Sequence, residues 1–435
     1  MNSLRVRSNL VLSRASTFRQ RASWLILLAG CLASSVTQAG LCLVDKDAAG
    51  ANNGTTWEDA YTHLAGAMLH SHCDELWVAG GTYTPTDSQD PQGRFILQPG
   101  IEVYGGFAGT ETEREQRDPR ANPTILSGDL GDGIHSIALV FFEGFDHDQD
   151  PPPAPQVLDG FTVTGGVTSS INEFGAGIYI DAGTHIGVQR ECNPILRNLI
   201  IEGNAAGTGG GGVFIDATID GFSSPIFENV TFINNTALSG AAMYIDGHGA
   251  AACPTLNNVT FVDNHAEDFA GGILLIQNVT EACLVMNNAT FSGNTSGISG
   301  SAITISAEGS TGGTPTFNNI IVWGNPTGDD KQFADLHPVA EINNSVIESG
   351  CPTGSTCNNL VSTDPFLGAL GDHGGLTPTM PISKSGSAFD AGDDATCLPT
   401  DQRGVPRPQG EHCDIGAYEK PVGFFADGFE SAPPP

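Results

Sequence analysis

Short runs of β-branched and aromatic residues, separated by Asn, Gly and Pro, recur about every thirty residues along the middle of the chain. Five copies share an inner Asn, and successive copies of it lie 31, 29, 30 and 31 residues apart, at Asn198, Asn229, Asn258, Asn288 and Asn319. A second block of two small residues before Ile, Val or Met recurs in step. Such a period is typical of stacked supersecondary units, and no copy has room for a ten-residue helix.

The repeat predicts an all-β fold, a right-handed parallel β-helix in which each coil of chain lies about 4.8 Å from the previous one. Equivalent side chains then stack, so we expect Phe232, Phe261 and Phe291 to lie one above another, with Val322 next. We also expect a ladder of amides, each donating to the next, formed by Asn204, Asn235, Asn264, Asn294 and Asn325.

The ends of such a stack expose strand edges that need covering. Six residues between Trp57 and Met68 fall on one face of a predicted helix, and Thr56 with Asp59 has the spacing of a capping box. This short helix should cover the first coil. The expected organisation is a signal peptide (1–39), an N-terminal segment with the capping helix (40–75), the β-helix (76–350), a less regular C-terminal region (351–420) and a flexible tail (421–435).

The N-terminus has the pattern of an export signal. Residues 1–39 carry five Arg and no acidic residue, and an apolar stretch from Trp24 to Leu32 precedes small residues before Gly40. We therefore expect a secreted or cell-surface protein with no transmembrane span in the mature chain. An alternative stays open, because Leu28-Ala29-Gly30-Cys31 matches a bacterial lipobox, in which Cys31 would carry a lipid and hold the protein at the outer membrane.

Composition narrows the classes of function. The chain has 49 acidic and 17 basic residues and a net charge of -32, so it lacks the basic surface of a protein that binds nucleic acid. Abundant Gly, in place of the Ala, Glu, Lys and Leu of helical bundles, excludes a coiled coil. The runs of Phe, Ile and Val exclude a disordered chain.

The cysteines give a more specific prediction. Nine Cys follow the signal peptide, none in a CxxC pair, and export makes disulfides the default state. Cys253 and Cys283 are equivalent residues of adjacent coils, about 5 Å apart, whereas Cys192 is two coils from Cys253, roughly 10 Å and too far to bridge. The predicted pairs are Cys253–Cys283, Cys351–Cys357, Cys397–Cys413 and Cys42–Cys73, which leaves Cys192 free.

Two acidic loops are candidate calcium sites. Asp146, Asp148 and Asp150 alternate as in a loop for a hard cation, and Asp129 and Asp132 form a second acidic turn. The first loop lacks the Gly and the later Glu of an EF-hand, so a solvated acidic loop is the alternative interpretation. We expect no cofactor other than calcium.

No catalytic residue is assigned from the sequence. A pectinase-like hydrolase needs paired carboxylates in one groove, and Gly247-His248-Gly249 matches only one element of such a site. A lyase needs a basic residue to remove a proton, but the repeats from Ile178 to Asn325 contain only Arg190 and Arg197 as basic residues. The strongly negative protein would also repel an acidic polysaccharide.

The repeat pair of Gly-Gly-Ile/Val and Phe-x-x-Asn resembles that of chlamydial polymorphic outer-membrane proteins and related pectin-lyase-like β-helix proteins. The end of the chain resembles the choice-of-anchor Q domain of bacterial secreted proteins, in the segments Asp364-Pro365-Phe366-Leu367, Gly374-Gly375-Leu376-Thr377-Pro378-Thr379 and Cys413-Asp414-Ile415-Gly416-Ala417-Tyr418-Glu419. The resemblance covers nearly all of residues 41–420 and implies an exported, surface-associated β-helix protein.

These features predict a monomeric bacterial surface or secreted protein. Its expected role is non-catalytic, adhesive or carbohydrate-contacting, toward a polysaccharide or a host or cell-surface ligand. The alternative is a polysaccharide lyase or glycoside hydrolase of pectin-lyase-like fold. Carboxylates and a basic residue converging in one groove would favour the enzyme, whereas a smooth groove lined by Asn, Thr and aliphatic residues would favour the binding protein.

Overall fold

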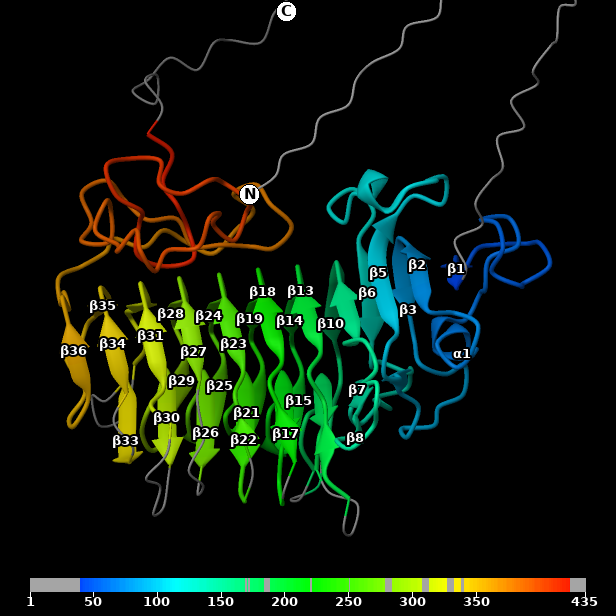
Figure 1. Cartoon of the computed structure of the whole chain (residues 1–435), viewed down its shortest axis with the longest axis horizontal. Helices are drawn as coiled ribbons and strands as arrows, with labels where there is room; N and C mark the ends of the chain where they lie inside the picture. The colour runs from blue at the N-terminus through cyan, green and yellow to red at the C-terminus, as the bar shows by residue number, and fades with distance from the viewer. Residues whose placement is uncertain are drawn as a thin grey trace, which may run out of the picture. The chain divides into compact units, whose positions relative to one another are not determined.

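The computed structural model of the chain describes residues 40–168, 170, 173–183, 188–219, 221–249, 251–277, 284–306, 313–326, 332–337 and 340–422. Within these ranges, parallel strands from successive coils stack into three long sheets (Figure 1). The parallel β-helix predicted from the repeat is confirmed. The signal peptide, Cys31 and the tail from residue 423 lie outside the described residues.

The longest sheet has 11 strands, and nearly every coil contributes one strand to it. Its strands, in spatial order, are β1 (Leu41–Val44), β2 (Glu75–Ala79), β5 (Glu102–Phe107), β9 (Val157–Asp159), β13 (Ile195–Arg197), β18 (Ile226–Glu228), β23 (Thr255–Asn257), β27 (Val285–Asn287), β31 (Thr316–Asn318), β34 (Glu341–Asn343) and β36 (Thr356–Asn358).

Two further sheets complete the walls of the coil. The 9-stranded sheet contains β3 (Gly81–Tyr83), β6 (Thr124–Ser127), β10 (Phe161–Thr164), β14 (Ile200–Glu202), β19 (Thr231–Ile233), β24 (Thr260–Val262), β28 (Thr290–Ser292), β32 (Ile321–Val322) and β35 (Val346–Ile347). The 8-stranded sheet contains β33 (Phe333–His337), β30 (Ile303–Ser306), β26 (Ile273–Gln277), β21 (Met243–Gly247), β16 (Val213–Asp216), β11 (Ile178–Asp181), β7 (Val140–Glu143) and β4 (Phe95–Leu97).

Two small sheets flank these walls. One, called the outer sheet below, contains β15 (Ala205–Gly209), β20 (Thr236–Ser239), β25 (His265–Phe269) and β29 (Thr295–Ser296). The other contains β22 (Ala251–Ala252), β17 (Phe222–Ser223), β12 (Arg190–Glu191) and β8 (Phe145–Asp146), and its β12–β8 pair is antiparallel.

The register places like residues on like. Phe232 pairs with Phe261, Phe261 with Phe291 and Phe291 with Val322. The ring centroids of Phe232 and Phe261 are 4.7 Å apart and those of Phe261 and Phe291 4.4 Å, with nearly parallel planes. All three side chains are fully buried in the main core, which fills the inside of the coil. The stack has the register that the repeat predicted.

The predicted Asn ladder is also present. Each side-chain amide donates to the next Asn Oδ1, at 3.1 Å from Asn204 to Asn235, 2.9 Å from Asn235 to Asn264, 2.8 Å from Asn264 to Asn294 and 2.9 Å from Asn294 to Asn325. The same Nδ2 atoms donate to strand carbonyls, such as Phe232 O from Asn264 at 3.1 Å. The ladder thereby satisfies backbone carbonyls that are buried at the corner between two sheets.

The inner Asn of each repeat closes a second corner. Its backbone has a positive φ in every copy, at 54°, 57°, 53°, 55° and 53° in chain order from Asn198 to Asn319. This left-handed conformation is costly for most side chains and is tolerated best, after Gly, by Asn and Asp. The repeat of Asn at these positions is therefore explained by the corner.

The N-terminal helix is shorter than predicted. Only α1 (Leu64–Ala67) is helical, and Leu64, Ala67 and Met68 are buried in the main core. Residues before it are held away from helical geometry because Tyr61 exchanges backbone hydrogen bonds with the first strand, donating to Leu43 O at 2.9 Å. Thr56 Oγ1 accepts from Asp59 N at 3.1 Å, so the expected capping contact closes a turn instead of starting a helix.

Three of the predicted disulfides are present, at Cys42–Cys73, Cys351–Cys357 and Cys397–Cys413. Cys253 is disulfide-bonded, but its predicted partner Cys283 lies outside the described residues. Cys192 is a buried free cysteine, and burial raises its pKa well above the usual thiol range, so this thiol stays protonated and unreactive. Among the described residues, no helix is long and apolar enough to cross a membrane.

The C-terminal region does not simply close the far end of the stack. It lies alongside the coils rather than beyond the last of them (Figure 1). Ile382, Ile415 and Tyr418 pack on Ile321 and Val346, which lie on the outer face of the 9-stranded sheet. The outward Thr of successive strands bind it as well: Gln402 Nε2 donates to Thr231 Oγ1 at 2.7 Å, and Thr260 Oγ1 donates to Gln402 Oε1 at 2.6 Å. The region thus braces several coils along their flank.

Phe261→Ala tests the ring stack. Because this ring is fully buried between two others, we expect its loss to reduce the free energy of unfolding by about 3–5 kcal/mol. Guanidinium denaturation followed by circular dichroism measures the change. Phe366→Ala is the matched control, since the Phe366 side chain is 52% exposed and its loss should cost less than about 1 kcal/mol. Equal losses in the two variants would contradict the stacked core.

Candidate functional site

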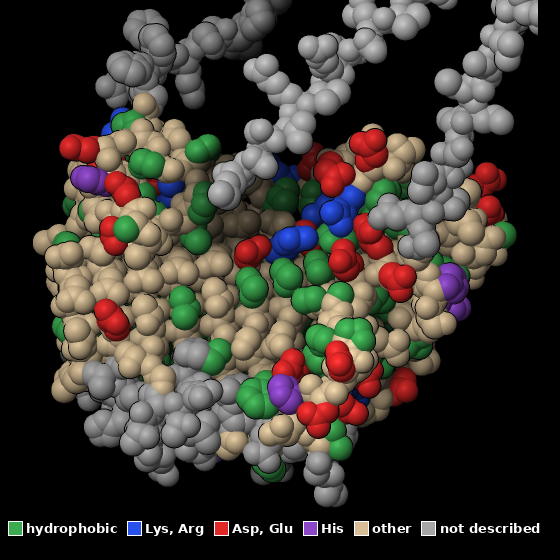
Figure 2. Space-filling view, in the orientation of Figure 1, with side chains coloured by type: hydrophobic (Ala, Val, Ile, Leu, Met, Phe, Trp, Pro, Cys, Tyr) green, Lys and Arg blue, Asp and Glu red, His purple; other side chains and the backbone are tan. Residues whose placement is uncertain are grey.

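A groove of about 540 Å³ separates the 9-stranded sheet from two projecting segments. Its floor is formed by residues at the start of β10 and β14, including Thr162 and Ile200, and its walls by residues 118–124 and 372–378. Across its rim, Arg120 Nη2 and Asp372 Oδ2 are 2.6 Å apart, although they are 252 residues apart in sequence. Figure 2 shows basic and acidic side chains gathered beside a hollow in this face.

The groove continues into a smaller pocket of about 270 Å³, with which it shares Asp118, Pro119 and Leu376. The centre of this pocket is Asp159, whose side chain is 4% exposed. Arg117 Nη2 lies 2.7 Å from Asp159 Oδ1, and Arg197 Nε lies 2.6 Å from Oδ2. Asn198 Nδ2 donates to Oδ1 at 2.8 Å, so this carboxylate is fully engaged.

Local backbone geometry brings the arginines here. The 3-10 helix η1 (Arg114–Gln116) ends just before Arg117, whose Nη1 donates to Gly105 O and Asp159 O, both at 3.0 Å. Gly160 permits this approach, because a Cβ atom there would lie 2.7 Å from Arg117 Nη1. The guanidinium groups of Arg114 and Arg117 also lie over the Tyr104 ring, at 4.5 Å and 5.3 Å from its centroid.

The surroundings of Arg197 and Asp372 favour the charged form of each side chain. Burial alone would lower the pKa of Arg197, but Asp159 and its hydrogen bond outweigh it, and the net pKa is raised. The backbone N–H of Gly374 and then Arg120 hold the pKa of Asp372 below its usual range. Neither Arg197 as a base nor Asp372 as an acid is suited to proton transfer near neutral pH. The paired charges instead offer fixed donors and acceptors.

The charges lining the two pockets balance. Four arginines, namely Arg114, Arg117, Arg120 and Arg197, face four carboxylates, namely Glu115, Asp118, Asp159 and Asp372. The lining is therefore neutral overall, in a chain whose net charge is -32. A lining without net charge gives no net attraction to a charged ligand, so this site does not favour an ionic ligand over an uncharged one.

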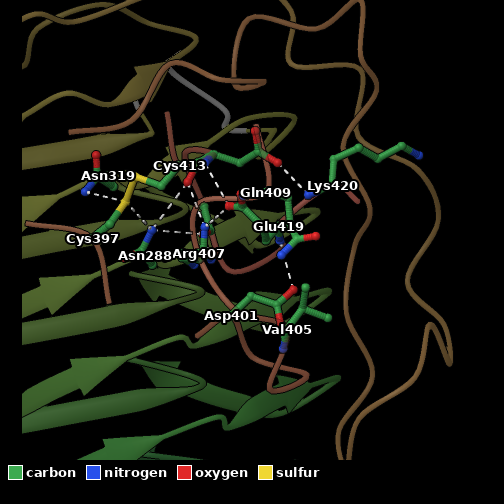
Figure 3. A network of polar contacts seen from close by, with 12 residues as sticks. Asn288, Asn319, Cys397, Asp401, Val405, Arg407, Gln409, Cys413, Glu419 and Lys420 are labelled. Carbon is green, nitrogen blue, oxygen red and sulfur yellow. Dashed lines mark hydrogen bonds and ion pairs between the residues drawn. A yellow bond between two sulfur atoms is a disulfide. The ribbon is translucent and has the colours of Figure 1, made fainter. Parts of the chain in front are cut away.

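A buried polar network fixes the wall that the C-terminal region supplies (Figure 3). Arg407 Nη1 and Glu419 Oε2 are 2.9 Å apart, with side chains 1% and 0% exposed. Arg403 Nη2 lies 2.6 Å from Asp401 Oδ2, which also accepts from Glu419 N at 2.9 Å. Removing one member of such a pair would leave a buried charge without its partner. The network holds the wall through Arg403, whose Nη1 donates to His373 O at 3.3 Å.

The network also contains a carboxyl group that titrates near neutrality. Burial raises the pKa of Asp414 to about 7, although the backbone N–H groups of Lys420 and Asp390 donate to it. Its side chain is 1% exposed and lies among Glu419, Arg407 and Asp390. A proton on Asp414 therefore stabilises the folded C-terminal region.

The predicted calcium loops do not converge. Asp146, Asp148 and Asp150 are exposed, and Asp132 Oδ2 accepts from Gln89 Nε2 at 2.8 Å. Within the described ranges, neither loop belongs to a group of three His, Cys, Asp or Glu side chains that could hold a metal ion. The group that qualifies is Cys42, His72 and Cys73, whose two sulfurs are joined in a disulfide and so are not metal ligands. Calcium at the acidic loops stays a prediction.

Sequence reasoning missed the groove and the adjoining smaller pocket, which together are called the arginine-lined groove below. Of its four arginines, the repeat pattern singles out only Arg197, as one of two basic residues in the repeats. A usable signal exists, since Arg114, Arg117 and Arg120 lie within seven residues of a chain that is poor in basic residues. Gly247-His248-Gly249 lies elsewhere, and His248 Nδ1 is 2.5 Å from Asp246 Oδ1. Among the described residues, that tripeptide does not line the groove.

No protein-family model matches the chain, and no curated protein sequence matches it. Among solved structures, the crystal structure of pectate lyase Pel9A is similar to it, with 13% sequence identity and a TM-score of 0.41, over 87% of this chain and 96% of that chain. At this identity the likeness concerns the fold alone. The resemblance to the choice-of-anchor Q domain stays a prediction.

Asp414 makes the stability of the C-terminal region depend on pH. The raised pKa means that the folded state binds the proton more tightly, so this contribution is present below about pH 4 and is lost as pH rises toward and past 7. We expect a loss of roughly 2–4 kcal/mol across this window. Thermal unfolding at pH 5 and pH 8, with hydrogen exchange over residues 401–420, measures it.

Asp414→Asn removes the titration and should flatten this pH dependence. Glu411→Gln, at an exposed carboxyl group of the same region, is the matched control and should leave the dependence unchanged. If Asp414→Asn keeps the full difference between pH 5 and pH 8, another group is responsible.

Proposed function

We propose that this chain is an exported binding protein whose groove holds an uncharged carbohydrate chain without transforming it. The observation that carries the proposal is the neutral, preorganised lining of four arginines and four carboxylates. The exposed pair of Arg120 and Asp372 supplies a donor and an acceptor for sugar hydroxyls, whereas the buried Asp159 fixes the arginines beside it. Leu376, Pro119 and Pro378 supply apolar surface for the C–H faces of sugar rings.

Export from a bacterial cell is supported by the signal-like N-terminus and by three disulfides between described cysteines, which persist in oxidising compartments. The mature protein is proposed to be a secreted or cell-surface monomer, with lipidation at Cys31 as the alternative route of attachment. Mass spectrometry of the exported protein distinguishes these routes, because cleavage before Gly40 and a diacylated Cys31 give different N-termini.

The alternative function, a polysaccharide lyase or glycoside hydrolase, is less well supported. A glycosidase needs one carboxyl group that stays protonated to act as the acid, and Asp372 has the opposite tendency. A lyase would need an unprotonated base beside an acidic sugar, and the raised pKa of Arg197 opposes that role. The surrounding negative charge also repels acidic substrates.

A glycan array and affinity electrophoresis on purified protein test the proposal. We expect retention by a neutral polysaccharide, weaker or no retention by polygalacturonate, and no release of reducing ends or unsaturated products, with or without Ca²⁺. Product release from any glycan would replace the binding role with the enzymatic one. Absence of retention on every neutral glycan would refute the proposal.

Arg120→Ala locates the binding site. This side chain is 47% exposed and its pair with Asp372 is screened by solvent, so the fold should persist without it. We expect affinity for the retained glycan to fall about tenfold, as measured by calorimetry. Lys46→Ala is the matched control, because Lys46 forms a comparably exposed pair with Asp47 away from the groove lining. If Arg120→Ala binds the glycan as tightly as Lys46→Ala does, the binding site lies outside the groove.

A further inference from the structure

The outer face of the 11-stranded sheet carries two rows of side chains beside the arginine-lined groove. From β13 to β34, each strand buries its middle residue in the core and directs the residues on either side outward, as Leu256 lies between Thr255 and Asn257. Parallel pairing holds the outward residues of successive strands in register. The two rows therefore run along the stack and across the strands.

One row consists of side-chain amides on five successive strands. These residues, called the amide row below, are Asn257, Asn287, Asn318, Asn343 and Asn358. Each Nδ2 donates to the Oδ1 of the preceding Asn, at 2.9, 3.0, 3.1 and 2.8 Å in chain order.

The amide row keeps unused hydrogen-bonding capacity. An Asn side chain has two N–H donors and two lone pairs on its oxygen, and the contacts along the row use one of each in its inner members. Within the described part of the chain, these five side chains make no other hydrogen bond, and all of them are half-buried or exposed. The second N–H and the second lone pair of each amide can therefore bind a ligand or water.

The second row supplies apolar surface beside the amides. Its members are Ile195, Ile226, Thr255, Val285, Thr316, Glu341 and Thr356. From β23 to β36, Glu341 is the one charged residue of the two rows, in a chain whose net charge is -32. Amides with spare donors next to methyl groups match the hydroxyl groups and C–H faces of an uncharged sugar chain.

The amide row continues the smaller pocket of the arginine-lined groove. In the same outward row, Asp159 pairs with Arg197, Arg197 with Glu228 and Glu228 with Asn257. Asp159 and Arg197 line that pocket, and Asn257 lies two strand spacings beyond Arg197, at about 10 Å. The amide row covers four more spacings, or about 19 Å. A chain that leaves the pocket along this row meets the amides directly.

We propose that the two rows extend the groove and hold the continuation of a linear, extended, uncharged polysaccharide. The inference rests on the proposed carbohydrate binding and adds the class of chain that is bound. Rows that keep register over five strands fit a ribbon-like chain, such as a β-(1→4)-linked glucan or mannan, whereas a coiled chain touches them at few points. An acidic chain is disfavoured, because neither row offers a basic side chain from β18 onward.

Calorimetry of the purified full chain with cello- and manno-oligosaccharides of three and six units tests the extension. The groove alone can hold a trisaccharide, and a hexasaccharide that starts in the pocket reaches the amide row. We expect one of the two hexasaccharides to bind at least tenfold more tightly than its trisaccharide. Maltohexaose, whose α-(1→4)-linked chain coils, should bind no more tightly than maltotriose.

The double variant Asn287→Ala, Asn318→Ala removes two amides from the middle of the row. Affinity for the hexasaccharide should fall about tenfold, to the trisaccharide level, while affinity for the trisaccharide stays unchanged. A purely structural role of the ladder would not change this ratio. The single variant Asn318→Ala repeats the test if the double variant does not fold. Thr236→Ala is the matched control, because it truncates an exposed polar side chain of the outer sheet and should change neither affinity.

The outcomes separate this inference from the proposed function. Equal affinity for trisaccharide and hexasaccharide in the wild type overturns the extension and leaves binding in the groove intact. So does an unchanged ratio of the two affinities in the Asn variants. Length dependence confined to malto-oligosaccharides, or binding confined to other neutral glycans, overturns the class of chain. If no neutral glycan binds, the proposed function fails and the extension fails with it.

Discussion

The whole structure depends on pairing between coils that keeps equivalent residues in register. A coil has no sheet of its own, so its backbone groups find partners only in the coil before it and the coil after it. The Asn ladder makes this dependence stricter, because Asn235 accepts from Asn204 and donates to Asn264. A shift of one residue would break the ladder and turn Phe261 out of the core. The period of the sequence is thus a structural requirement.

The side chains inside the coil are all needed for packing, so a binding site can form only from residues outside it. The inward side chains are committed to stacking, and the inner Asn residues are committed to the left-handed corner. The groove arises where two segments outside the repeat, residues 118–124 and 372–378, meet over the 9-stranded sheet. Arg403, paired with the buried Asp401, holds the second segment by donating to His373 O at 3.3 Å. Binding surface is therefore built by additions to a fixed scaffold.

The same distinction, between the repeats and the segments added outside them, decides what could be predicted from the sequence. The Phe stack and the Asn ladder follow from the period of the repeat, which can be counted along the chain. The predicted partners of Cys42, Cys351 and Cys397 are also confirmed, although the coil spacing itself predicts only Cys253–Cys283. The groove and its adjoining pocket do not, because Arg117 and Arg197 reach Asp159 from different coils, and Asp372, which pairs with Arg120, belongs to a region without a repeat. The helix before Leu64 was overpredicted, because backbone pairing of Tyr61 with the first strand outweighs helical periodicity.

Departures from like-on-like stacking are the most informative positions in such a fold. Where a repeat position keeps its residue type, packing explains it, as for the rings of Phe232, Phe261 and Phe291. Where an outward row changes type while the inward residues of the same strands stay apolar, the scaffold itself gives no reason for the change. The outward row of the 11-stranded sheet is of this kind, since the charges that line the smaller pocket give way, two strands further on, to the amide row that begins at Asn257. In a repeat protein, the same comparison along each outward row can therefore point to candidate sites even when the chain resembles no protein of known activity.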